Sequence, residues 1–244
     1  NYDGKNTVRV IHCPLHEFKG MMGVNAHIDW IMSQTDTDFI VQCTADDVND
    51  IDRAAKTVAA YKETGASMVN AGIQFMQTDG DSDATRYPTK SGFVTATEVM
   101  RELVGGSTCP AWTHEFYDKI GGLHGPICPD VYMPYLATQD KGLYYIHDLL
   151  YCLIRWKDAN NTGLGGQMIA TDDPDKKMQL QELIQYQLVS TFTAIFKACQ
   201  KHYPNWSADD ITTLSAYTLG TSGYWAKLRD EMTKKRIQPM SLPS

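Results

Sequence analysis

The sequence predicts an α/β fold in which helices flank a sheet, followed by a helical C-terminal extension. The short apolar run Phe39–Val41 fits a buried strand of such a sheet. Apolar residues recur at three- and four-residue steps over 48–64, which predicts a helix, and a strand-like run follows at 68–76. A long stretch, 177–203, carries a broad apolar face along a helix.

Composition limits the classes of protein that the chain can be. Of its 244 residues, 43% are hydrophobic and 21% are charged, as in ordinary globular proteins. The net charge of -7 argues against a broad surface for nucleic acid or anionic membranes. No apolar run approaches the roughly 20 residues that span a bilayer, and the polar start of the chain lacks a signal-peptide pattern. Six scattered cysteines without a Cys-x-x-Cys pair indicate free thiols and a reducing, cytoplasmic location.

Turn and cap residues delimit the elements in the middle of the chain. Gly65 is suited to end the first periodic helix, because glycine adopts the left-handed conformation at helix C-termini. A second helix is expected over 95–103, opened by Thr95 or Thr97 with Glu98 near its first turn.

Two adjacent carboxylates, Asp46 and Asp47, follow the strand 39–41. Open α/β folds bind ligands at the carboxyl edge of the sheet, where two neighbouring acids repel each other unless a cation lies beside them. A divalent cation that carries a diphosphate fits that position. The alternative is that one of the two acids caps the helix that follows.

The order of motifs from Val8 to Trp156 resembles the family 2 glycosyltransferases, which have the GT-A fold, a Rossmann-like mixed sheet. The motifs that carry the resemblance are the strand Val8–Ile11, the helix start Lys19–Asn25, the acidic Thr44–Asp47, the glycines at Ile120–Gly122, the segment Pro129–Met133, the strand Leu143–Leu150 and the pair Arg155–Trp156. Together they cover about the first two-thirds of the chain. We therefore expect a GT-A-like core over 1–166 and a helical extension over 167–244.

The resemblance implies a reaction and a set of roles. A sugar would pass from a nucleotide-diphosphate sugar to an acceptor hydroxyl, with inversion at the anomeric carbon. Asp46 and Asp47 would hold Mg²⁺ or Mn²⁺, and Asp130 would be the general base. The residues expected to bind donor or substrate are Asn25, Thr44, Trp112, His114, Arg155 and Lys157.

For two of these residues, Trp112 and Asp130, the sequence supports a second interpretation. Trp112 and His114 lie in an aromatic stretch that fits a sugar pocket, whereas the alternative is that Trp112 and Phe116 pack in the core. Asp130 precedes the apolar stretch 131–137, where it fits a helix N-cap as well as a base, and both roles are compatible.

Three departures from the family pattern support an alternative function. Thr44 stands where the family usually has Asp, Lys157 stands where it often has His, and nothing before Val8 resembles the first strands of the nucleotide pocket. These departures put metal dependence in question. The alternative is a non-catalytic or partner-dependent GT-A-like binding domain that acts through its helical tail.

The expected partners follow from charge and family resemblance. The donor would be a nucleotide-sugar, and the acceptor a glycan, a lipid-linked sugar or a protein, with nucleic acid less favoured by the acidic charge. The glycine-rich segment 158–166 fits either a loop that closes over the diphosphate or a linker. The helical tail is a possible oligomer interface.

Overall fold

The computed structural model describes residues 20–43, 47–77, 82–86, 91–102, 110–125, 127–155, 167 and 171–203. Its helices are α1 (Gly20–Ser33), α2 (Arg53–Thr64), α3 (Ala96–Glu102), α4 (His114–Ile120), α5 (Pro129–Gln139) and α7 (Pro174–His202). Its strands are β1 (Phe39–Val41), β2 (Val48–Asn49), β3 (Met68–Gln77), β4 (Ser82–Arg86), β5 (Gly92–Val94), β6 (Ala111–Thr113) and β7 (Leu143–Arg155). The α/β class and the long C-terminal helix are confirmed.

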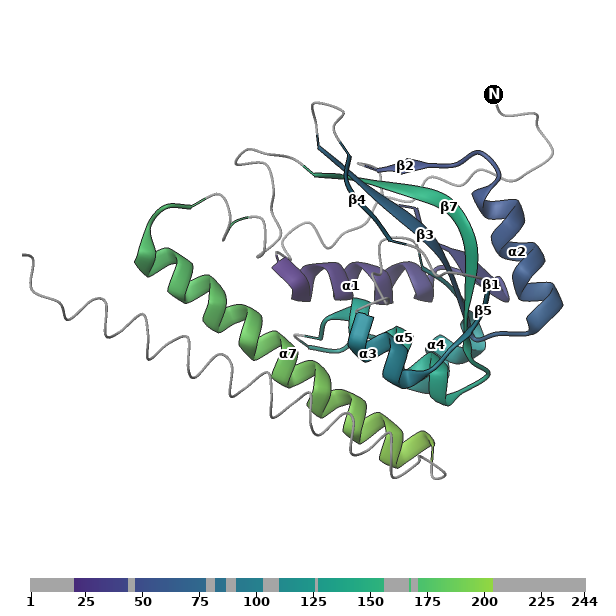
Figure 1. The fold of residues 1–244 in the computed structure, drawn as a ribbon. Helices are drawn as coiled ribbons and strands as arrows, with labels where there is room; N and C mark the ends of the chain where they lie inside the picture. The colour runs from purple at the N-terminus through teal and green to yellow at the C-terminus, as the bar shows by residue number, and fades with distance from the viewer. Residues whose placement is uncertain are drawn as a thin grey trace, which may run out of the picture.

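These strands form one mixed sheet (Figure 1). Strands β1, β6, β3, β7 and β2 lie side by side in that order, while β4 pairs with β3 and β5 pairs with β7. Strands β3 and β7 run parallel, and the other described pairs are antiparallel. In the register, Val41 lies opposite Ala111, and Ala111 opposite Val69. The carboxyl end of β1 is therefore level with the start of β3, with β6 between them, and β3 continues from Val69 for eight more residues to Gln77.

The predicted strand at 39–41 is confirmed, but it is only partly buried. It lies at an edge of the sheet, where it has the single strand neighbour β6 among the described strands. The ring of Phe39 stacks on Tyr61 of α2, with centroids 4.3 Å apart. An edge strand covered on one side explains why its apolar residues are not fully enclosed.

Helix α2 begins five residues later than the periodicity predicted. Val48 pairs with β7 instead, and it is 55% exposed. Ile51 is 95% exposed, so these two apolar residues do not belong to a buried helix face. The end of the helix is confirmed, because Gly65 adopts φ +65° and donates its N–H to Tyr61.

The start of α3 is a capping box, as the sequence predicted. The Thr95 hydroxyl accepts from the N–H of Glu98 at 3.2 Å, and the Glu98 carboxylate accepts from the N–H of Thr95 at 2.7 Å. Two otherwise unpaired N–H groups are satisfied reciprocally.

Helices cover both faces of the central strands. Met68 points into the main core, whereas its buried neighbours Val69 and Ala71 lie outside that cluster. Alternate residues of a strand point to opposite faces of the sheet. Val69 and Ala71 therefore point to the face that is covered by α2, because α2 packs on β3 and β7.

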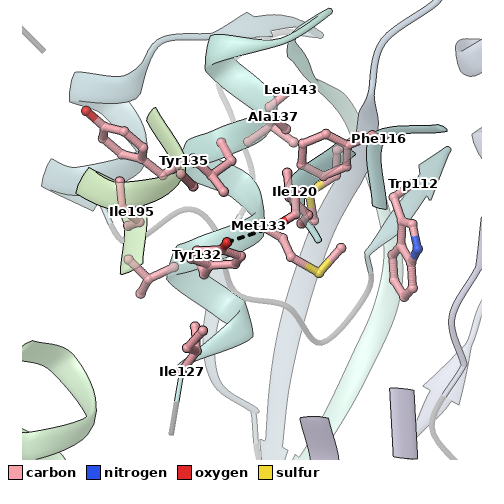
Figure 2. Close-up of a cluster of buried hydrophobic side chains, with 14 of the residues drawn as sticks. Trp112, Phe116, Ile120, Ile127, Tyr132, Met133, Tyr135, Ala137, Leu143 and Ile195 are labelled. Atoms are coloured by element: carbon pink, nitrogen blue, oxygen red, sulfur yellow. Dashed lines mark hydrogen bonds between the residues drawn. The ribbon is translucent and has the colours of Figure 1, made fainter. Parts of the chain in front are cut away.

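The main core lies between the sheet and helices α1, α3, α4, α5 and α7 (Figures 1 and 2). It includes Phe116 of α4, Tyr135 of α5 and Ile195 of α7, each at most 1% exposed. Helix α7 packs on α5 and α4 through Phe192, Ile195 and Cys199. The domain boundary at 166/167 stays a prediction, but α7 shares the core of the segment before it.

Several expected features lie outside the described residues. They are the strand at 8–11, the segment 158–166 and everything after Tyr203. Three cysteines have a described state, and none of Cys43, Cys128 and Cys199 is in a disulfide. Within the described ranges, no helix has the length and apolar character needed to cross a membrane.

A polar cluster ties the end of α5 to the sheet. The Asp140 carboxylate, 8% exposed, accepts from Ser67 and from the Lys119 ammonium, each at 2.5 Å. Lys119 also lies 4.6 Å from the ring centroid of Tyr203, beyond the end of α7. Despite partial burial, the bonds from Lys119 and Ser67 hold the pKa of Asp140 below its usual value.

We expect Asp140→Asn to lower the free energy of unfolding by about 1–2 kcal/mol at pH 7, because charge-assisted hydrogen bonds are lost. Since the folded-state pKa is depressed, the contribution is present above the unfolded pKa of about 4 and is lost as pH falls below it. Urea unfolding at pH 7 and pH 3 measures both values. If wild type and Asp140→Asn differ in the free energy of unfolding by the same amount at both pH values, the role of the ionised Asp140 carboxylate is contradicted.

Candidate functional site

The first turn of α5 carries Asp130. Cys128 is the N-cap, Pro129 the first helical residue and Asp130 the second. The prediction that Asp130 caps the helix is therefore wrong by two positions. The Cys128 thiol makes no capping bond, but its carbonyl accepts from the N–H groups of Val131 and Tyr132 at 3.2 and 3.0 Å.

Desolvation dominates the electrostatics of this turn. It raises the pKa of Asp130 to about 6, against the weaker opposing effect of the residue's own backbone N–H. Burial and the charge of Asp130 raise the pKa of the Cys128 thiol to about 12. At neutral pH Asp130 is thus an ionised carboxylate with the proton affinity of a general base, and Cys128 is a neutral thiol.

The peptide group between Ile127 and Cys128 is held at both ends. The Asn25 side-chain amide of α1 donates to the Ile127 carbonyl at 2.8 Å and to the Gly125 carbonyl at 3.0 Å. The Thr191 hydroxyl of α7 accepts from the Cys128 N–H at 2.8 Å. The two helices therefore meet at the point where the chain enters α5.

Asn25 was expected to bind the donor, and the structure places it beside the entry to α5. It is 1% exposed, and its amide nitrogen is occupied by two main-chain carbonyls. Its Oδ1 atom has no hydrogen-bond partner among the described residues. The structure thus connects Asn25 to Asp130 through Ile127, three residues before the carboxylate.

One turn further along α1, Asp29 holds the loop that leads to α5. Its Oδ1 accepts from the Tyr117 hydroxyl and from the Leu123 N–H, the latter at 2.8 Å. Burial and the bond to Asp29 raise the pKa of Tyr117, so that the phenol stays protonated and donates. His124 lies 3.5 Å from the other oxygen of the same carboxylate.

The acid pair is only half described. Asp46 and Thr44 lie outside the described residues, whereas Asp47 is partly buried just before β2. Within the part of the chain that the structure describes, no group of three or more His, Cys, Asp or Glu residues is arranged to hold a metal ion. The metal role of Asp46 and Asp47 therefore stays a prediction.

Arg53, at the start of α2, holds both ends of the loop that contains the acid pair. Its side chain is 2% exposed and donates to the Gln42 carbonyl at 2.7 Å and to the Asn49 side-chain oxygen. It also lies 3.5 Å from the Cys43 sulfur. A buried guanidinium places a permanent positive charge next to Gln42, Cys43 and Asn49.

Trp112 and His114 follow each other closely but lie in different environments. Trp112 is 2% exposed in the core, 6.2 Å from the Tyr117 ring, and its indole nitrogen has no partner among the described residues (Figure 2). This placement matches the packing alternative. His114 opens α4, with Nδ1 3.3 Å from the Thr37 carbonyl and Nε2 3.6 Å from Asp118.

Arg155 and Lys157 mark the end of β7. Arg155 is the last residue of the strand and lies opposite Gln77 in the register. Its side chain and all of Lys157 lie outside the described part of the chain. Their proposed contact with phosphate stays a prediction.

Sequence reasoning missed Asp29, Arg53 and Thr191. A signal existed for Asp29, because it lies one turn after Asn25 and three residues before the buried Met32 on the same helix face. Arg53 and Thr191 carried no comparable signal, since their partners are main-chain and side-chain atoms of distant or irregular segments.

The fold of the chain is distantly similar to that of solved structures, one of which is TarS. No protein-family model matches the sequence, and no curated protein matches it either. The crystal structure of S. aureus TarS, residues 1–349, in complex with UDP-GlcNAc has a TM-score of 0.44 and 9% sequence identity to this chain. The match covers 84% of this chain and 60% of the TarS chain, less than two thirds of its length. At this level of similarity the family of the chain stays unassigned.

Two adjacent glycines test the contact between α1 and the loop. Gly121 and Gly122 both adopt φ +78°, so an alanine at either is strained by about 1–2 kcal/mol. A Cβ atom at Gly121 would meet open space, whereas one at Gly122 would lie 2.7 Å from Oδ1 of Asp29. We expect Gly122→Ala to lower the free energy of unfolding by at least about 1 kcal/mol more than Gly121→Ala, because Asp29 must leave its two donors. Urea unfolding of the two variants gives the comparison, and equal losses would contradict the role of Asp29.

Proposed function

We propose that this chain is a GT-A-like glycosyltransferase that transfers a sugar from a nucleotide-diphosphate sugar to an acceptor hydroxyl with inversion. The observation that carries the proposal is Asp130, a carboxylate with a pKa of about 6 in the first turn of α5. The order of sequence motifs supports the same assignment, since Asp130 occupies the position of the base in the family that the chain resembles.

The chemistry assigned to Asp130 is proton removal. The carboxylate takes the proton of the acceptor hydroxyl as the oxygen attacks the anomeric carbon of the donor. The bond from that carbon to the diphosphate breaks, and the nucleoside diphosphate leaves with the bonding electron pair. A pKa near 6 leaves the base ionised at neutral pH and still basic enough to accept a proton.

Asp46 and Asp47 are the proposed ligands of a divalent ion. Carboxylate oxygens suit Mg²⁺ and Mn²⁺, and the ion would neutralise charge on the leaving diphosphate. Arg155 and Lys157 are proposed to add positive charge on the same side. Thr44 and His114 are proposed to contact the donor, whereas Trp112, 2% exposed, is assigned to core packing.

One observation favours the alternative, a non-catalytic or partner-dependent binding domain. The buried Arg53 guanidinium, a permanent positive charge, donates to Gln42 and Asn49, which flank the segment that carries the acid pair in the sequence. If the positive charge of Arg53 takes the place of a metal ion, donor binding does not depend on Mn²⁺. Calorimetric titration with UDP-, GDP- and dTDP-sugars, with and without Mn²⁺, separates the two functions.

For Asp130→Asn we expect kcat to fall by about 10²–10⁴-fold with donor affinity changed less than about 2-fold, because the amide cannot accept the proton. The wild-type rate should rise with pH through about 6, and the variant should lack this limb. Initial rates from pH 5 to 8 and calorimetric donor binding measure both effects.

Stability provides the control for this variant. Because the folded-state pKa of Asp130 is raised, the folded state loses stability as pH rises from about 4 to about 6. Asp130→Asn should therefore be at least as stable as the wild type at pH 7. A pH limb that persists in the variant would remove Asp130 from the mechanism.

For Asp47→Asn we expect donor affinity in the presence of Mn²⁺ to fall by about 10-fold or more, and affinity without Mn²⁺ to stay nearly constant. Asp172→Asn is the matched control, because it removes the same charge from an exposed position before α7. Calorimetry with and without EDTA makes the measurement. An unchanged dependence on Mn²⁺ in Asp47→Asn would contradict the metal role.

A further inference from the structure

A single peptide group joins three helices at the start of α5. Its carbonyl, on Ile127, accepts from Asn25 of α1, and its N–H, on Cys128, donates to Thr191 of α7, each at 2.8 Å. Both side chains are buried, with Asn25 1% and Thr191 0% exposed. Water therefore has little access to compete for either bond.

The orientation of the Thr191 hydroxyl fits the role of an acceptor. The hydroxyl donates its proton to the Gln187 carbonyl at 2.6 Å, within its own helix. A lone pair is then free to accept from the Cys128 N–H. In a capping box, a Glu or Gln at the third helical position accepts from the N-cap N–H. That position in α5 is Val131, whose side chain has no hydrogen-bond acceptor. Thr191 of α7 therefore supplies the acceptor for the N-cap N–H that α5 itself lacks.

The chemistry at Asn25 is equally specific. Its Nδ2 atom donates to two carbonyls, those of Gly125 and Ile127. An aspartate would turn an acceptor toward both carbonyls and repel them. The unpaired Oδ1 atom indicates that this position uses the two donors of the amide rather than its acceptor.

We propose that Asn25 and Thr191 are positioning residues that fix the first turn of α5 and, through it, the carboxylate of Asp130. Helix α7 then helps to position the site, in addition to covering the core. This inference rests on the proposed function for the role of Asp130 in turnover, whereas the clamp on the peptide group can be measured without turnover.

The internal hydrogen bonds of α5 explain why the turn needs external anchors. Pro134 lies inside the helix and has no N–H, so the Asp130 carbonyl lacks its usual donor four residues on. The first turn is thus tied to the rest of the helix by one bond fewer. The Asn25 and Thr191 bonds hold it in place from outside.

The test compares Thr191→Val, which removes the hydroxyl at nearly constant shape, with Thr191→Ser, which retains it. In the full chain we expect the Cys128 amide to exchange at least about 10-fold faster in Thr191→Val and at the wild-type rate in Thr191→Ser. With a donor that the wild type turns over, kcat should fall about 10-fold in Thr191→Val with the donor KM changed less than about 2-fold. Thr191→Ser should restore kcat.

The two proposals fail in different ways. If the wild type turns over none of the UDP-, GDP- and dTDP-sugars, the proposed function fails, while amide exchange and the Asp130 carboxyl ¹³C chemical shift still report the clamp. If Thr191→Val changes neither the exchange rate of the Cys128 amide nor the chemical shift of the Asp130 carboxyl, the positioning role is overturned. It is also overturned if Thr191→Ser behaves like Thr191→Val. Should Thr191→Val not fold, the wild type decides: a Cys128 amide that exchanges as fast as an exposed one overturns the proposal.

Discussion

The arrangement of the site depends on satisfying one main-chain peptide group away from water. Buried N–H and C=O groups need partners, and α5 begins without a capping side chain of its own. Asn25 and Thr191 meet that need from two other helices. The positions of α1, α5 and α7 are therefore set together, and the carboxylate of Asp130 is placed by contacts that it does not itself make.

The same burial gives Asp130 its chemistry. Desolvation makes the ionised form costly and moves the pKa toward neutrality, which weakens the fold above that pH and strengthens the carboxylate as a base. A residue that costs stability needs rigid surroundings. The bonds of Asp29 to Tyr117 and Leu123 and the bond of Lys119 to Asp140 contribute to that rigidity around the C-terminal half of α4.

The sequence predicted those elements whose signals are local. Gly65, Thr95 and Glu98 mark helix ends through bonds within a few residues, and the structure has them as expected. The start of α2 was misplaced because Val48 follows the helical period by chance and pairs with β7 across a hundred residues of chain. Local pattern cannot show such a pairing.

The site residues also differ in whether their signal in the sequence is local or depends on distant residues. Asp130 was found from its place before an apolar stretch, although its cap position was assigned wrongly, because a cysteine is a rare N-cap. The roles of Asn25 and Thr191 depend on the carbonyl and N–H of residues far along the chain, and a polar residue on a helix gives no hint of a main-chain partner.

Arg53 has a consequence for how the two halves of the proposed site respond to acidification. An arginine guanidinium keeps its charge throughout the physiological range, so its grip on Gln42 and Asn49 persists when the surroundings become mildly acidic. Asp130 gains a proton under the same conditions. Mild acidification is therefore expected to protonate the proposed base while the bonds of Arg53 to Gln42 and Asn49 persist.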